Sequence, residues 1–77
     1  MNTCYICEYS WIIIGKKIAE GNATVKLSEA SVVRRWTNGK GIGGIAKAEN
    51  KNEYVLDAIG DVIISKSKVI FAIPCEW

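Results

Sequence analysis

The sequence predicts a mainly β protein: a small antiparallel bent sheet or barrel of five to six short strands, with at most one short helix. The chain has 77 residues, which is enough for a single domain over residues 1–77. Short runs of β-branched and aromatic residues recur along it, closely separated by turn residues. Only one segment has helical spacing, so the strands must build the core.

The first half of the chain contains the clearest strands. Residues 3–14, TCYICEYSWIII, form an apolar run whose alternation is imperfect, as expected of a strand covered on both faces. Residues 15–17 interrupt it, and Gly21-Asn22 predicts a turn. Residues 23–28 alternate apolar with polar, so one face should meet the core and the other water. Residues 31–36 read as a further strand, or as its continuation past a bulge.

The middle of the chain is rich in glycine. Asn38-Gly39 suits a type I′ hairpin turn, but the glycines that follow disfavour a regular return strand. Ile42, Ile45 and Ala46 have the spacing of one helix face, which predicts a short helix that continues to about Asn50.

The last part of the chain predicts more short strands. Residues 54–59 and 62–65 are strand candidates separated by a turn at Gly60-Asp61. After a tight connection at residues 66–68, residues 69–73 form an apolar strand that Pro74 ends, because proline donates no backbone hydrogen bond. The final three residues are expected to trail off.

Composition limits the partners. Hydrophobic residues make up 49% of the chain, a large share for so small a domain, so we expect apolar surface to be buried between copies in a homo-oligomer. A net charge of +2 is too weak for a non-specific nucleic-acid binder. The apolar runs are too short for a secretory signal or a membrane span, and the cysteine count is odd. We therefore expect a cytoplasmic protein with reduced thiols and no membrane partner.

The sequence offers little for catalysis. It has no histidine, the commonest general base and metal ligand. Cys4-x-x-Cys7 with Cys75 leaves a zinc site one ligand short, and the motif lies within a strand rather than at the start of a redox helix. No serine has a nucleophile motif. We expect three buried thiols, no metal, no cofactor and no enzyme activity.

One stretch combines the groups that bind anions. Gly39, Gly41 and Gly44 match G-x-G-x-x-G, but no long helix and second parallel strand follow, as a dinucleotide fold requires. Glycine N–H groups can nevertheless approach an anion, arginine can grip phosphate, and tryptophan can stack on a base. The candidate ligand site comprises Arg34, Arg35, Trp36, Lys40, Gly41, Gly43 and Gly44.

The same residues also have an ordinary interpretation: a solvated basic strand end, a glycine loop and a tryptophan packed in the core or an interface. Arg34 and Arg35 are neighbours on a strand, so their side chains should point to opposite faces. Only one of them would then contact a given ligand, while the other could reach a partner subunit.

The sequence resembles small phage and prophage proteins. The resemblance covers roughly residues 23–75 and rests on Val33-Arg34-Arg35-Trp36, a small-residue loop leading to Gly44-Ile45-Ala46, and an apolar last strand that closes on Ile73-Pro74-Cys75. It implies a β-rich accessory or host-facing viral protein. It implies no catalytic residue.

We therefore expect a non-enzymatic phage counter-defence protein that oligomerises and sequesters a small anionic ligand such as a nucleotide signal. Two alternatives are a structural or assembly protein of the phage and an inhibitor that docks directly on a host protein.

Overall fold

The computed structural model describes residues 1–77, and its five strands form one antiparallel sheet in the order β4-β3-β2-β1-β5. The strands are β1 (Asn2–Cys7), β2 (Ile12–Glu20), β3 (Thr24–Trp36), β4 (Tyr54–Ser65) and β5 (Val69–Pro74). Four short 3-10 helices connect them: η1 (Glu8–Ser10), η2 (Ile42–Ala46), η3 (Ala48–Glu53) and η4 (Lys66–Lys68). The predicted mainly β class is confirmed. None of the helices is long and apolar enough to cross a membrane.

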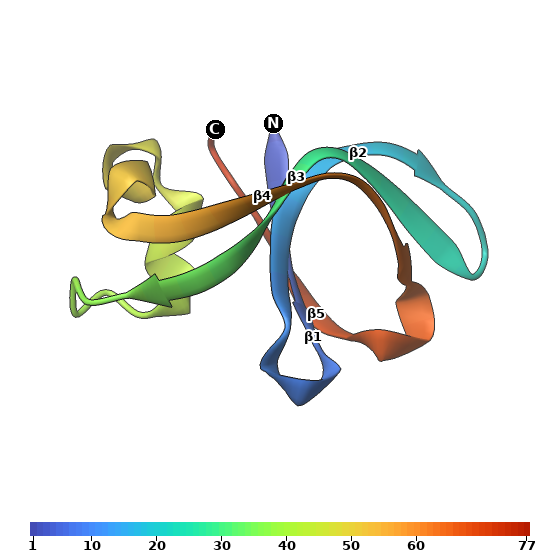
Figure 1. The fold of residues 1–77 in the computed structure, drawn as a ribbon, viewed down its shortest axis with the longest axis horizontal. Helices are drawn as coiled ribbons and strands as arrows, with labels where there is room; N and C mark the ends of the chain where they lie inside the picture. The colour runs from blue at the N-terminus through green and yellow to red at the C-terminus, as the bar shows by residue number, and fades with distance from the viewer.

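The sheet bends strongly where β3 and β4 pair. Glu29 and Gly60 have positive φ angles of 50° and 78°, and the register shifts on both sides of the Ala30–Gly60 pair. The ribbon curls beyond this bend, and Figure 1 shows β2, β3, β4, β5 and β1 arranged around a ring. The predicted turn at Gly60-Asp61 is wrong, because Gly60 provides a bend inside one continuous strand.

The first predicted strand is in fact a hairpin. Tyr9 and Ser10 both have positive φ angles, 61° and 64°, and the Trp11 N–H donates to the Glu8 carbonyl at 3.4 Å. These are the left-handed angles that a type I′ turn requires, and the Cys7 N–H donates to the Trp11 carbonyl at 2.7 Å, so residues 8–10 form the loop. The predicted interruption at residues 15–17 is also wrong: β2 continues through Gly15, where an added Cβ would lie 3.1 Å from Ala30.

The sheet has a hydrophobic core on each face. The glycine-side core comprises Cys4, Ile14, Val33, Ile45, Tyr54 and Cys75. The ring core comprises Tyr5, Cys7, Val25, Leu27, Ala30 and Ile64. Successive residues of β1 alternate between the two cores, which explains why this strand is apolar throughout.

The segment between β3 and β4 covers the glycine-side core. Only Gly39 of the Asn38-Gly39 pair has a positive φ, so the pair does not form the type I′ turn that it suits. No return strand follows it, as the glycines predicted. The predicted helix is two 3-10 helices, η2 and η3, separated at Lys47 by an extended backbone. Ile45 of η2 is fully buried against the sheet.

The last three residues hold this segment in place, instead of trailing off. The Trp77 indole Nε1–H donates to the Ile45 carbonyl at 2.7 Å, and the Glu76 N–H donates to the Ala46 carbonyl at 2.8 Å. The Asn2 N–H donates to the Trp77 carbonyl at 2.6 Å. The tail therefore joins η2 to the first residues of β1.

Candidate functional site

The structure places Arg34 and Arg35 on the same face of the sheet. Val33 pairs with Leu56 and Trp36 with Tyr54, and Leu56 and Tyr54 are two residues apart in β4, so all four side chains share one face. Val33 and Trp36 share this face although they are three residues apart, because the register shift between Val33 and Arg35 inserts one extra residue into β3. Both arginines therefore project from the opposite face, and the prediction that they point to opposite faces is wrong.

The two arginines differ in their partners. Arg34 Nε lies 3.2 Å from Asp57 Oδ2, and both side chains are more than 45% exposed. Arg35 is exposed and forms no ion pair with an acidic side chain of this chain. Arg34 is thus ion-paired with a carboxylate on this face, whereas the guanidinium of Arg35 is exposed to solvent.

Trp36 lies on the other face, away from the arginines. Its ring packs against Tyr54 with centroids 5.7 Å apart at a tilt of 39°, and it is half-buried against the glycine-side core. This is the ordinary packed position that the sequence left open for it.

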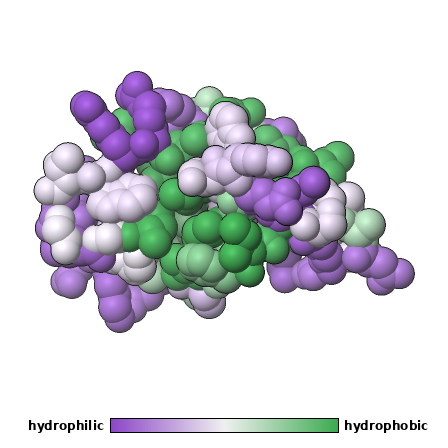
Figure 2. Space-filling view, turned by 90° about the horizontal axis from the view of Figure 1, so that it is seen from below, coloured by the Kyte–Doolittle hydropathy of each residue, from purple (hydrophilic) through white to green (hydrophobic).

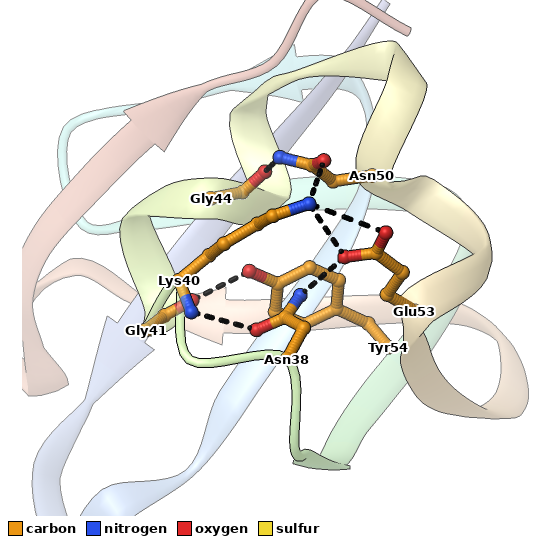
Figure 3. A network of polar contacts seen from close by, with 7 residues as sticks. All are labelled: Asn38, Lys40, Gly41, Gly44, Asn50, Glu53 and Tyr54. Atoms are coloured by element: carbon orange, nitrogen blue, oxygen red, sulfur yellow. Dashed lines mark hydrogen bonds and ion pairs between the residues drawn. The ribbon is translucent and has the colours of Figure 1, made fainter.

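Lys40 belongs to a polar network with the residues around it (Figure 3). Its Nζ lies 3.0 Å and 3.3 Å from the two carboxylate oxygens of Glu53, and it donates to Asn50 Oδ1 at 2.9 Å. The hydrogen bonds from Lys40 and then Asn38 lower the pKa of the Glu53 carboxyl below its ordinary value of 4.5. The charge of Lys40 is therefore already matched by an acid within the chain.

Three of the predicted glycines have different environments. An added Cβ at Gly44 would lie 2.5 Å from the Tyr54 hydroxyl and 2.8 Å from Lys40 Cβ, whereas one at Gly43 would meet nothing within 4 Å. Gly41 has a φ of 66° and accepts a hydrogen bond from the Tyr54 hydroxyl. Gly44 therefore lets the segment pack closely and Gly41 lets it turn, while an added Cβ at Gly41 or Gly43 would meet open space.

Sequence reasoning missed the centre of this network. Asn50 is 6% exposed, and its Nδ2 donates to the Gly44 carbonyl at 2.9 Å while its Oδ1 accepts from Lys40. The Gly44 carbonyl also accepts from the Lys47 N–H at 3.2 Å, so Asn50 adds a second hydrogen bond at the end of η2. No local signal distinguishes Asn50 from Asn52 in the polar run that contains both.

The thiols are buried and free, and burial raises the pKa of each. For Cys4 burial is the main cause, followed by the proximity of Cys75 and Cys7, and the pKa rises to about 12. No three Cys, Asp or Glu side chains lie close enough together to hold a metal ion.

The seven predicted residues therefore lie on opposite sides of the sheet. Arg34 and Arg35 project from one face, and the other five residues lie at the opposite face or in the segment that covers it. The surface has no pocket, so any ligand of the arginines would lie on an exposed face.

No family model, curated protein or solved structure matches this chain.

Proposed function

We propose that the protein is a non-enzymatic binding protein that holds a phosphate-type anion between Arg34 and Arg35. The observation that carries this proposal is the register shift between Val33 and Arg35, which places two adjacent guanidinium groups on one face. Each guanidinium offers a planar fork of donors suited to phosphate oxygens. An anion that bridges them would also relieve their mutual repulsion.

The charge balance of this face supports the same conclusion. Asp57 is within ion-pairing distance of Arg34, and Arg35 remains unpaired. Two cations facing one carboxylate leave an excess positive charge for a ligand. Trp36 and the glycines would contact this ligand only if another copy of the chain supplied them.

The chemistry of the buried groups supports a binding role rather than catalysis. A thiol must ionise to act as a nucleophile, and the raised pKa values keep all three cysteines protonated at neutral pH. The sequence has no histidine to activate a serine or a thiol.

The biological setting that we propose is the cytoplasm of an infected cell. A phage accessory protein that sequesters a nucleotide signal would blunt host defence by binding alone, with no reaction required. The alternative that an observation also favours is docking to a host or virion protein, because several large apolar side chains are exposed.

The test is a titration of the full chain with cyclic di-GMP, a probe with two phosphates, followed by NMR of the arginine side chains. We expect the Nε–H signals of Arg34 and Arg35 to shift, and affinity to fall at least tenfold in the Arg34→Ala, Arg35→Ala double variant. Lys26→Ala with Lys51→Ala is the matched control, because it removes two exposed cations that have no acidic partner.

Equal losses in the two double variants would show a general charge effect and contradict the proposed site. So would the absence of any arginine shift with both this probe and inorganic pyrophosphate at millimolar concentration.

A further inference from the structure

We propose that Trp11 extends the arginine site, so that the ligand is a nucleotide whose base stacks on the Trp11 indole while its phosphate lies between Arg34 and Arg35. This inference deepens the proposed function and rests on it, because it assigns the second half of the same ligand. It depends on how β2 pairs with β1 and β3, which gives Trp11 the same face of the sheet as the arginines.

Trp11 lies on the ring-core face of the sheet. The Cys7 N–H donates to the Trp11 carbonyl at 2.7 Å and Trp11 has an extended backbone, so it continues the pairing of β1 with β2. Residues opposite each other on neighbouring strands share a face, and Cys7 belongs to the ring core. Arg34 and Arg35 project from this same face, opposite the glycine-side core.

The pairing of β2 with β3 brings Trp11 next to Arg34. The ladder between these antiparallel strands ends at the Ile13–Val32 pair. Trp11 lies two residues before Ile13 and Arg34 lies two residues after Val32, so they are the next positions on this face beyond the pair. Figure 1 shows the end of β3 diverging from the β1–β2 hairpin there. The indole and the guanidinium therefore flank the site instead of stacking on each other.

The fold makes no use of the Trp11 indole. Trp36 packs on Tyr54, and the Trp77 indole N–H donates to the Ile45 carbonyl, whereas Trp11 has neither kind of contact. Trp11 is 57% exposed, while the other two tryptophans are half-buried. Its π face is therefore open to a base, and every base has a π face that can stack on it.

Apolar side chains lie between the indole and the cations. Ile13 and Val32 share this face and are half-buried, so they form an apolar floor for the sugar of the ligand. Figure 2 views the molecule from the end that carries the β1–β2 hairpin, where apolar and weakly polar surface is flanked by strongly hydrophilic side chains. A nucleotide matches this order of groups, whereas a bare phosphate would leave the indole and the floor uncovered.

The charges at this end match the same ligand. Arg35 has no acidic partner, and Asp57 is the one carboxylate that faces the two arginines. The acid of the β1–β2 loop, Glu8, is paired with Lys68 at 3.4 Å, so it leaves no unmatched negative charge beside the indole. All parts of this site come from one chain, so it is complete without a second copy.

Titrations of the full chain with GDP and with inorganic pyrophosphate test the inference, because both probes carry two phosphates and only GDP carries a base. Trp11→Ala should weaken GDP binding about tenfold, as expected for the loss of one stacked base, and change pyrophosphate affinity by less than about twofold. Trp11→Phe should keep most of the GDP affinity, since a phenyl group retains a π face. Phe71→Ala is the matched control, because Phe71 is 48% exposed on the opposite face, where it pairs with Ile6 beside the glycine-side core.

NMR of the wild-type chain gives a second test that needs no folded variant. The Trp11 Nε1–H signal, assigned by its loss in Trp11→Phe, should shift with GDP and stay in place with pyrophosphate. A signal that GDP leaves in place would overturn the inference, as would equal losses of GDP affinity in Trp11→Ala and Phe71→Ala. If the signals of Arg34 and Arg35 still shift in those cases, the phosphate site stands alone. Arginine signals that respond to neither probe would overturn the phosphate site and this inference together.

Discussion

Gly43 and Gly44 are neighbours with opposite steric surroundings, and they give the sharpest prediction at the scale of single residues. Gly44→Ala should destabilise the protein by about 1–3 kcal/mol, because the added methyl group would displace the Tyr54 hydroxyl or Lys40. Gly43→Ala should change the free energy of unfolding by less than about 1 kcal/mol, since its Cβ would meet open space. Urea unfolding followed by tryptophan fluorescence measures both. Equal losses in the two variants would contradict the packing described for Tyr54.

The residues of the candidate site could be named from the sequence, but their grouping could not. The adjacent arginines, the tryptophan and the glycines can be read directly from the sequence. Strict strand alternation then places Arg34 and Arg35 on opposite faces. The register shift that puts them together depends on how β4 pairs with β3, which is information from twenty residues away. The ion pair between Lys40 and Glu53 could not be predicted either, because it also joins residues that are distant in the sequence.

At the scale of secondary-structure elements, the β1–β2 turn carries strain that can be removed. Tyr9 and Ser10 both hold left-handed backbone angles, which cost non-glycine residues about 1–2 kcal/mol each. Tyr9→Asn with Ser10→Gly, the residues that type I′ turns prefer, should raise the free energy of unfolding by on the order of 1 kcal/mol. Tyr9 is 90% exposed, so little packing is lost.

The matched control for that turn is Ser67→Gly in η4, where φ is not positive. It should leave stability unchanged or lower it slightly, because glycine adds freedom to the unfolded chain without relieving strain. Urea unfolding of the two variants gives the comparison. A gain from Ser67→Gly as large as that from the turn variant would contradict the strain interpretation.

Elements with a regular period were the easiest to predict. The alternation of Val25 and Leu27 with polar residues identified β3, and Pro74 marked the end of β5. The failures lie where a residue departs from its usual role. Tyr9-Ser10 makes a left-handed turn without the asparagine or glycine that such turns favour, and Gly60 bends a strand instead of ending it.

At the scale of the whole molecule, Glu20 links the tip of the β2–β3 hairpin to the connection before β5. Its carboxylate oxygens lie 2.9 Å from Lys17 Nζ and 2.7 Å from Lys66 Nζ. The hydrogen bonds from Lys66 and then Lys17 lower the pKa of Glu20 from 4.5 to about 2. A lowered pKa in the folded state means that this contribution to stability is complete above pH 4.5 and is lost as the pH falls toward 2.

Glu20→Gln should therefore lower stability at neutral pH and flatten its decline between pH 4.5 and pH 2. Urea midpoints across this pH range measure the effect, and an NMR titration of the Glu20 carboxyl measures its pKa directly. Glu49→Gln is the control, because Glu49 is exposed and forms no ion pair. An unchanged pH profile in Glu20→Gln would show that the contacts are too mobile in solution to matter.

The whole-molecule prediction succeeded where it depended on composition. Closely spaced apolar runs in a 77-residue chain identified a small bent sheet, and imperfect alternation in residues 3–14 correctly indicated burial on both faces. The sequence could not show that the second face is covered by a glycine-rich segment and a C-terminal tail. That cover depends on backbone hydrogen bonds, such as the one from Glu76 to Ala46, which any sequence could make.

The position of β1 between β2 and β5 also determines when the protein can fold. The first strand of the chain waits for the last, since β5 is one of its two neighbours and Trp77 accepts a hydrogen bond from Asn2. During synthesis, the β1–β2 hairpin would leave the ribosome with apolar side chains exposed on both faces. Folding is therefore expected to follow completion of residues 69–77, and the nascent chain is a natural client for chaperones until then.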